Sequence, residues 1–358
     1  MNDAQRCTRC ITPSTWPGLT FDAEGVCNIC RNYERRWGAW LRDPALQAAS
    51  RQELVRHLEQ ARRHRKGRYD VLVPVSGGRD SLQVIVSMVR EFGMSVLAYT
   101  YDNGLMNPIA LENIRLVTEK LGVHHVLRSI PSQREVMRHF ARRTGAFCGA
   151  CSTPILLVAH RMAREEGIRT IVFGMSRRTD GMEVWGKGPF YFRDVVKDGL
   201  GMKAVRSIWG PHPIVDYAID TLTGRFDFVN MPDFVKWDDA KNARDLEQEF
   251  GVQLTTEHMD CIGSAYSSWV HLRRLGFGHS TIKQSYLVRA GLITREEALR
   301  REQEQDPQDP PANTPEIAER LGMTAEELLA AVDSDWKKYY RSPLTRLTQL
   351  HRSMLLAR

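Results

Sequence analysis

Residues 69–81 read YDVLVPVSGGRDS, and they constrain the fold more than any other segment of the chain. The apolar, β-branched run at 71–75 is typical of a buried parallel strand. Gly77 and Gly78 end that run, and a helical pattern starts near Asp80. Two glycines allow the backbone to pass close to an anion, and the start of the next helix offers unpaired N–H groups with a partial positive charge. The segment therefore predicts a phosphate-binding loop between a strand and a helix.

The order of the polar residues separates this loop from two commoner nucleotide motifs. Neither G-x-x-x-x-G-K-[ST] nor G-x-G-x-x-G is present. The string SGGRDS instead resembles the PP-loop, SGGxDS, of the N-type ATP pyrophosphatases. Those enzymes split ATP between the α and β phosphates and place AMP on an oxygen of their substrate. A Gly-Gly turn before an ordinary helix would explain the glycines, but not both serines and the aspartate.

The PP-loop resemblance implies a role for each residue of the loop. ATP would lie with its phosphates on the backbone N–H groups of Gly77 and Gly78, and the hydroxyls of Ser76 and Ser81 would donate to phosphate oxygens. Asp80 would bind Mg²⁺ directly or through water; its other candidate role is to cap the helix, and both can hold. The departing pyrophosphate needs a cation, for which the candidates are Arg79, Arg177 and Arg178.

Strand and helix patterns alternate along the chain after the loop. Four short apolar runs predict strands, at 71–75, 95–101, 124–127 and 170–173. This alternation predicts an α/β protein with a doubly wound parallel sheet, and the PP-loop implies the adenine nucleotide alpha hydrolase-like type. Ligands of such sheets bind beyond the carboxyl ends of the strands. We therefore expect Asp102, Asn103 and Gly174 to lie beside the nucleotide.

Four of the seven cysteines form a metal-binding pattern near the start of the chain. Cys7, Cys10, Cys27 and Cys30 have the spacing C-x2-C-x16-C-x2-C, which is typical of a tetrahedral zinc site in a reducing compartment. A pair of disulfides is the alternative, and a cytosolic location disfavours it. Four thiolates leave no open position on Zn²⁺, so the expected role of the metal is structural.

The other three cysteines suit a different metal group. Cys148 and Cys151 form a second C-x-x-C pair, and Cys261 follows 110 residues later. Three thiolates without a fourth are unusual for structural zinc, but they suit a [4Fe–4S] cluster whose fourth iron is left for an external ligand. The alternative is that all three are small buried apolar residues, as free cysteines often are.

Composition limits the class of protein without deciding its function. The sequence predicts five parts: a zinc knuckle at 1–32, a helical connector at 33–66, the ATP pyrophosphatase domain at 67–235, a helical substrate or cluster region at 236–304, and a linker with C-terminal helices at 305–358.

No signal-peptide core and no run of 18 apolar residues occurs, so we expect a cytoplasmic protein without a membrane partner. The net charge of +7 suits an enzyme that handles ATP; RNA binding is possible but not favoured, because the basic residues are scattered. A homodimer is possible.

A wider resemblance extends from Cys7 to about Ala298. The knuckle with TFDAEGVC (20–27), the PP-loop, and the segments LGFGHS (275–280) and GLITREEA (291–298) resemble the N-acetyl sugar amidotransferase branch of the PP-loop enzymes. These relatives convert a sugar N-acetyl group to an acetamidine, with ammonia from a separate glutaminase subunit, in surface-polysaccharide biosynthesis. The second C-x-x-C pair departs from that branch. It resembles instead the PP-loop tRNA sulfurtransferases, in which such a pair and one distant cysteine hold a [4Fe–4S] cluster.

The two resemblances imply two enzymes with the same first step. In both, ATP activates a carbonyl or amide oxygen of a small molecule or nucleobase as the AMP ester. Sulfur from a donor protein through a cluster on Cys148, Cys151 and Cys261 would then replace the oxygen, or else ammonia would. The sulfurtransferase is the first hypothesis and the amidotransferase is the alternative. His258, Asp260 and His279 are candidate proton carriers. A zinc-knuckle RNA-binding protein with an inactive PP-loop is a third reading, disfavoured by the intact motif.

Overall fold

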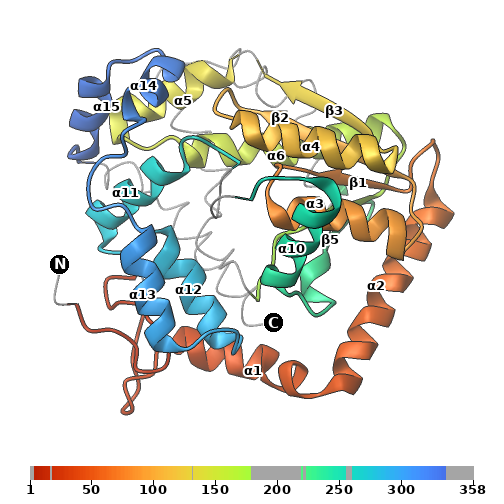
Figure 1. The fold of residues 1–358 in the computed structure, drawn as a ribbon, viewed down its shortest axis with the longest axis horizontal. Coiled ribbons are helices and arrows are strands. Elements are labelled where there is room, and N and C mark those ends of the chain that lie inside the picture. Colours follow the sequence, from red (N-terminus) through yellow and green to blue (C-terminus); the bar gives the residue numbers. More distant parts are fainter. Residues whose placement is uncertain are drawn as a thin grey trace.

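The computed structural model describes residues 4–16, 18–130, 132–178, 219–220, 223–254 and 260–335. Its centre is a five-stranded parallel sheet with the order β3-β2-β1-β4-β5 (Figure 1). The strands are β1 (Val71–Pro74), β2 (Val96–Asp102), β3 (His124–Ser129), β4 (Thr170–Phe173) and β5 (Asp227–Asn230). This confirms the doubly wound α/β fold. The strand order reverses between β1 and β4. The switch point, where such sheets bind ligands, is therefore at the carboxyl end of β1, where the phosphate loop begins.

Helices surround this sheet and continue beyond it. They are α1 (Asn28–Arg42), α2 (Pro44–His64), α3 (Arg79–Val86) with a π-helical turn (Ser87–Glu91), α4 (Pro108–Leu121), α5 (Gln133–Thr144), α6 (Cys148–Glu165), α10 (Asp239–Phe250), α11 (Ser264–Leu275), α12 (His279–Arg289), α13 (Arg295–Gln305), α14 (Thr314–Leu321) and α15 (Ala325–Val332). A 3-10 turn, η3, covers Met231–Asp233. Among the described residues no helix is long and apolar enough to cross a membrane.

Both faces of the central strand β1 are buried, and its successive residues point to opposite sides of the sheet. Val71 and Val73 of β1 pack in one core with apolar residues of α2, α3, α4 and α10. Leu72, between them, packs in a second core with residues of α6. The continuous apolar run in the sequence has this two-sided burial as its physical reason.

Two helix boundaries and one strand differ from the sequence-based expectation. The helical stretch that starts near Tyr33 breaks at Asp43, whose carboxylate accepts a hydrogen bond from Ala45 N while Pro44 takes the first helical position. Helix α6 begins at Cys148, so the second C-x-x-C pair, for which no helix was predicted, lies in its first turn. Strand β5 is not among the four strands predicted from the sequence, and it lies in the range 180–233. Most of that range, 179–218 and 221–222, lies outside the described residues.

The N-terminal knuckle, described over residues 4–16 and 18–30, packs against the distant helix α12. Trp16 stacks on Phe277, just before α12, with ring centroids 4.9 Å apart. Tyr33 of α1 meets Tyr286 of α12 edge to face at 6.2 Å. Figure 1 shows the knuckle and α1 beside α12 and α13, although these segments are far apart in sequence. The knuckle is therefore part of the helical C-terminal region in space.

Asp306, in the proline-rich segment that the sequence predicts as a linker, is buried at the start of α12. Its Oδ1 accepts hydrogen bonds from Ser280 N (3.1 Å) and Ser268 Oγ (2.9 Å). Its Oδ2 accepts one from Thr281 N (3.3 Å). A Cβ on Gly278 would lie 2.3 Å from the Asp306 carboxyl carbon, so the approach requires glycine. This carboxylate therefore satisfies the unpaired N–H groups of the first turn of α12.

Candidate functional site

The phosphate loop joins β1 to α3 and closes on its own hydroxyl groups. Ser76 N donates to Ser81 Oγ (3.1 Å), and Ser81 Oγ donates to Gly78 O (3.0 Å). The Ser76 and Ser81 hydroxyl oxygens lie 3.4 Å apart. The two serines of the motif thus face each other across the loop, at the N-terminus of α3. A helix start with polar side chains turned inward is suited to bind an anion.

Two glycines let neighbouring backbones approach this loop. Gly77 has φ +82°, and a Cβ there would lie 2.2 Å from the carbonyl oxygen of Ala110 at the start of α4. Gly174, which follows β4, comes close to α3: a Cβ on it would lie 2.7 Å from Asp80 O. The structure therefore explains Gly174 by its contact with the loop helix; contact with a nucleotide stays a prediction.

A cluster of four charged side chains lies at the first turn of α3. Arg79 donates from Nε and Nη2 to the two carboxylate oxygens of Asp80, at 3.0 Å each. The same Nη2 lies 2.9 Å from Asp239 Oδ2, and Lys283 Nζ lies 3.3 Å from that oxygen. The indole N–H of Trp237 donates to Asp80 Oδ1 (2.8 Å). Residues 237–239 and 283 belong to the helical region, so the cluster joins that region to the loop.

Sequence reasoning found only half of this cluster. Gly78, not Asp80, is the N-cap of α3, so the predicted capping role of Asp80 is wrong. Burial opposes ionisation of Asp80, but the charges of Arg79 and Lys283 outweigh it and hold the pKa of Asp80 below its usual value. Asp239 and Lys283 were missed, because no local motif marks them. The only sequence signal was a lysine on a mostly buried helix.

The other two candidate arginines are engaged elsewhere after β4. Arg177 pairs with the buried carboxylate of Asp233, from Nε to Oδ2 at 2.6 Å, and is 41% exposed. Arg178 is buried and donates to Pro232 O (2.6 Å), with its guanidinium 4.1 Å from the centre of the Trp40 ring. Arg79 is therefore the candidate arginine that lies in the loop itself.

The cysteine triplet meets at the end of β2. Cys148 and Cys151 lie in the first turn of α6, where residues three apart share one helix face. Asn103 follows β2 and donates from Nδ2 to Cys151 Sγ (2.9 Å). The backbone of Cys261 pairs with that of Met106 in an isolated antiparallel β-bridge. The hydrogen bond from Ile262 N to Leu105 O (2.9 Å) extends this pairing. Three distant segments thus bring the thiols to the carboxyl edge of the sheet, on the strand next to the phosphate loop.

Asn103, in the turn after β2, faces this triplet. Asp102 Oδ1 accepts from Gly104 N (2.8 Å) and Asn103 Oδ1 from Leu105 N (2.7 Å), so both shape the turn. Burial raises the pKa of Cys261 to about 12, and the neighbouring Cys148 adds to the shift. Burial likewise raises the pKa of Cys151. Burial therefore favours the protonated form of both thiols. Contact of Asp102 and Asn103 with a nucleotide stays a prediction.

The triplet is not arranged as the ligand set of a single ion, and a cluster there stays a prediction. Among the described residues, only the knuckle cysteines form a group of three or more possible ligands within 4.8 Å of one another. A [4Fe–4S] cluster takes one thiolate on each of several irons, so its ligands need not lie that close together. Amide donors also point at the sulfurs: Asn103 at Cys151, and Gly263 N at Cys261 (3.4 Å). Such donors are common around cluster thiolates.

The candidate proton carriers are spread over this region. His279, the first residue of α12, has its Nε2 3.4 Å from Ser267 Oγ, and Ser267 also contacts the Cys148 thiol. The carbonyl oxygen of Asp260 accepts a hydrogen bond from Asn107 N (3.1 Å). His258 lies outside the described residues. Their roles in proton transfer stay predictions.

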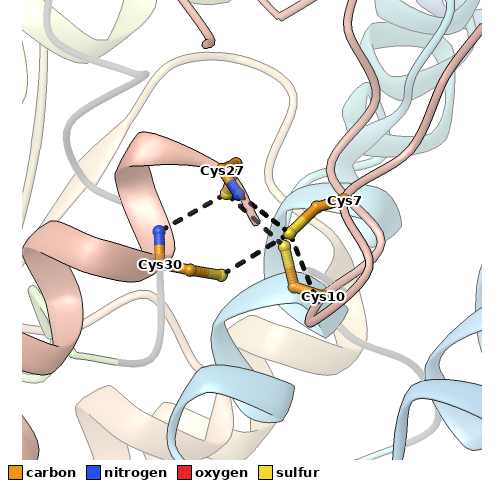
Figure 2. Close-up of side chains that lie close together, drawn as sticks. All are labelled: Cys7, Cys10, Cys27 and Cys30. Carbon is orange, nitrogen blue, oxygen red and sulfur yellow. Dashed lines mark hydrogen bonds between the residues drawn. The ribbon is translucent and has the colours of Figure 1, made fainter. Parts of the chain in front are cut away.

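The four knuckle cysteines form a closed, buried site (Figure 2). The Sγ atoms of Cys7 and Cys30 lie 4.0 Å apart, and those of Cys10 and Cys27 lie 3.9 Å apart. Four sulfurs placed tetrahedrally at about 2.3 Å from one ion would be separated by about 3.8 Å. The four thiols therefore match the ligand set of a single tetrahedral metal ion.

A buried arginine from α12 completes this site. Arg289 is 2% exposed and donates from Nε to Cys30 Sγ (3.4 Å) and from Nη2 to Cys10 Sγ (3.3 Å). Hydrogen bonding from Cys27 and Cys30 lowers the pKa of Cys10, and the Arg289 charge lowers it further. A buried guanidinium needs a negative partner. Thiolates on a divalent ion supply that charge, because four of them leave a net charge of −2.

Similarities to solved structures are weak. NMN synthetase from Francisella tularensis is 12% identical, with 73% of this chain and 92% of that chain covered and a TM-score of 0.39. NH3-dependent NAD synthetase from Campylobacter jejuni is 11% identical, with 57% and 93% covered and a TM-score of 0.31. The U34-tRNA thiolase NcsA from Methanococcus maripaludis, with its [4Fe–4S] cluster, is 14% identical, with 82% and 90% covered and a TM-score of 0.34. Scores this low do not bear on what the chain binds.

The sequence comparison is more specific. No curated protein matches the chain. Residues 244–350, which begin within α10, match the family described as LPS biosynthesis protein WbpG-like, C-terminal domain. The matched segment contains Cys261, Lys283, Arg289 and Asp306. The last third of the chain is thus similar to the C-terminal domain of WbpG-like lipopolysaccharide biosynthesis proteins, in agreement with the wider resemblance drawn from the sequence.

Proposed function

We propose that this chain is an ATP-dependent enzyme that adenylates a carbonyl or amide oxygen and releases AMP and pyrophosphate. The observation that carries the proposal is the loop after β1. Its glycine at positive φ, its two facing hydroxyls and the start of α3 lie at the switch point of a doubly wound parallel sheet. The first turn of α3 adds Arg79 for phosphate and Asp80 for Mg²⁺.

The chemistry divides one difficult substitution into two easier steps. An amide oxygen is a poor leaving group, but as an AMP ester it departs as the phosphate monoester. Attack of the amide oxygen on the α-phosphorus forms the P–O bond and breaks the bond to the β-phosphate, so pyrophosphate leaves. A nucleophile then adds to the carbon, and AMP carries the oxygen away.

For the second step we propose sulfur, because Cys148, Cys151 and Cys261 converge beside the loop. These residues would hold a [4Fe–4S] cluster, with Asn103 as a hydrogen-bond donor to Cys151. When bound, the cluster would hold the sulfur that replaces the activated oxygen. The acceptor would be a small molecule or nucleobase, and a separate donor would supply the sulfur.

A second candidate function is supported by the WbpG-like match of residues 244–350. In this alternative the acceptor is an N-acetyl sugar of a surface polysaccharide, and ammonia from a separate glutaminase replaces the oxygen to give an acetamidine. The name of the matched family refers to lipopolysaccharide biosynthesis, which favours a sugar acceptor. The same family match is compatible with the first, ATP-dependent step.

The knuckle is proposed to hold structural Zn²⁺. Sulfur separations near 4 Å and the tetrahedral arrangement support a single ion, and four thiolates leave no position for a substrate. Metal analysis of protein purified without added metal should give about one zinc per chain. Iron at this site, retained after both Cys148 and Cys151 are replaced, would contradict the assignment.

Two assays test the proposed reaction. Isothermal titration with α,β-methylene-ATP should show binding, and acceptor mixtures should release pyrophosphate and AMP in equal amounts from ATP. Anaerobic purification followed by iron and sulfide analysis then separates the two candidates. An iron-free enzyme that works with ammonia would overturn the sulfur proposal. Cys148→Ala should abolish turnover if sulfur is transferred, and leave most of it if nitrogen is.

A further inference from the structure

The charge cluster at the first turn of α3 holds two cations on one carboxylate oxygen. Arg79 Nη2 and Lys283 Nζ lie 2.9 Å and 3.3 Å from Asp239 Oδ2. The side chain of Lys283 is only 8% exposed and that of Arg79 is 18% exposed. Two cations with different origins, one in the phosphate loop and one on α12, thus meet at a single anionic atom.

The position of Asp239 Oδ2 accounts for the meeting of Arg79 and Lys283 at this oxygen. The Arg79 side chain starts one residue after the N-cap of α3, where the unpaired N–H groups of the loop attract an anion. A carboxylate that bridges a buried lysine and a half-buried arginine at such a place resembles one edge of a phosphate group. Asp239 therefore occupies the role that a phosphate oxygen would have.

Lys283 supplies half of the positive charge in this cluster. Arg79 and Lys283 face Asp80 and Asp239, so the four side chains sum to zero. Without Lys283 the sum of the side-chain charges is −1, before any Mg²⁺ is counted, and one of the two cations that would face a polyphosphate in this largely buried cluster is lost. Like charges within such a site repel strongly, because the effective dielectric constant is low.

We propose that Lys283, together with Arg79, binds the β- and γ-phosphates of ATP, and that Asp239 holds both cations in place until the nucleotide displaces it. Lys283 thereby makes the helical C-terminal region part of the nucleotide site. This inference rests on the proposed function, since it requires that ATP binds at the loop. It assigns a phosphate-binding residue that lies more than 200 positions from the motif.

Calorimetric titrations with two nucleotides test the inference. For Lys283→Met, the affinity for Mg²⁺–α,β-methylene-ATP should fall at least about tenfold, which corresponds to about 1.4 kcal/mol, while the affinity for AMP stays unchanged. Lys283→Arg should keep most of the affinity for the triphosphate. Lys241→Met is the matched control: Lys241 is exposed, lies on α10, and pairs with Asp245 one turn away.

A second variant covers the case in which Lys283→Met fails to fold. Asp239→Asn removes the displaced anion, so the affinity for α,β-methylene-ATP should be equal or higher. A purely structural ion pair predicts the opposite, a fall that matches any fall in thermal stability. Equal losses for α,β-methylene-ATP and AMP in Lys283→Met, or weaker triphosphate binding by Asp239→Asn, overturn the inference alone. A wild-type protein that binds neither nucleotide overturns the proposed function as well.

Discussion

Replacement of Asp306 by alanine should lower the free energy of unfolding by about 2–3 kcal/mol. The carboxylate is 5% exposed and accepts hydrogen bonds from two backbone N–H groups of the first turn of α12 and from Ser268 Oγ. Loss of an N-cap acceptor costs about 1 kcal/mol, and a buried hydroxyl left without its acceptor costs about 1–3 kcal/mol. Relief of the buried charge offsets part of this sum.

The assay is urea unfolding followed by tryptophan fluorescence. Trp16 stacks on Phe277 just before α12, so its signal reports on this region. The chain offers a close control, because Asp309 is also followed by proline but is exposed. Asp309→Ala should change the free energy of unfolding by less than about 0.5 kcal/mol. If both variants unfold at the same urea concentration as the wild type, the capping argument for Asp306 is refuted.

The remaining predictions concern the loop, the knuckle and pH. Gly77→Ala should remove nucleotide binding and cost at least about 1–2 kcal/mol of stability, because φ is +82° and the new Cβ would meet Ala110 O; unchanged titration with α,β-methylene-ATP would contradict this. Cys10→Ser should release the knuckle metal and lower the melting temperature, as should a strong chelator applied to the wild type, while an equal metal content would count against the site. Burial raises the pKa of Asp306, so the wild type should lose stability relative to Asp306→Asn as the pH rises from about 4 through the raised pKa; a constant difference would oppose this.

The parallel sheet could be predicted from the sequence because its signals are local. The apolar run of β1 and the helix after SGGRDS have a short period, and the structure places both within one or two residues of the prediction. Strand β5 could not be found in this way. Its four residues, Asp227–Asn230, alternate little and owe their conformation to pairing with β4.

The sequence predicts the site residues that belong to a local motif. It does not predict the residues that reach the site from distant helices. The convergence of the knuckle cysteines was predicted correctly, because it depends only on the short segment of chain between them. Lys283 and Arg289 reach their partners only after α12 has packed, and neither has a local signature. The burial of Asp306 within the predicted linker was missed for a related reason: composition does not reveal which carboxylate caps a helix start.

The thiolate site has a consequence for the order in which the molecule is made. Arg289 donates to Cys10 across 279 positions of sequence and to Cys30 across 259. The first cysteines leave the ribosome long before this guanidinium exists, and synthesis runs at about 5–20 residues per second. During that interval the nascent knuckle has its four thiols but lacks the Arg289 guanidinium. It also lacks the aromatic side chains of Phe277 and Tyr286, against which it packs in the folded chain. The knuckle therefore reaches its final arrangement only after α12 has been synthesised.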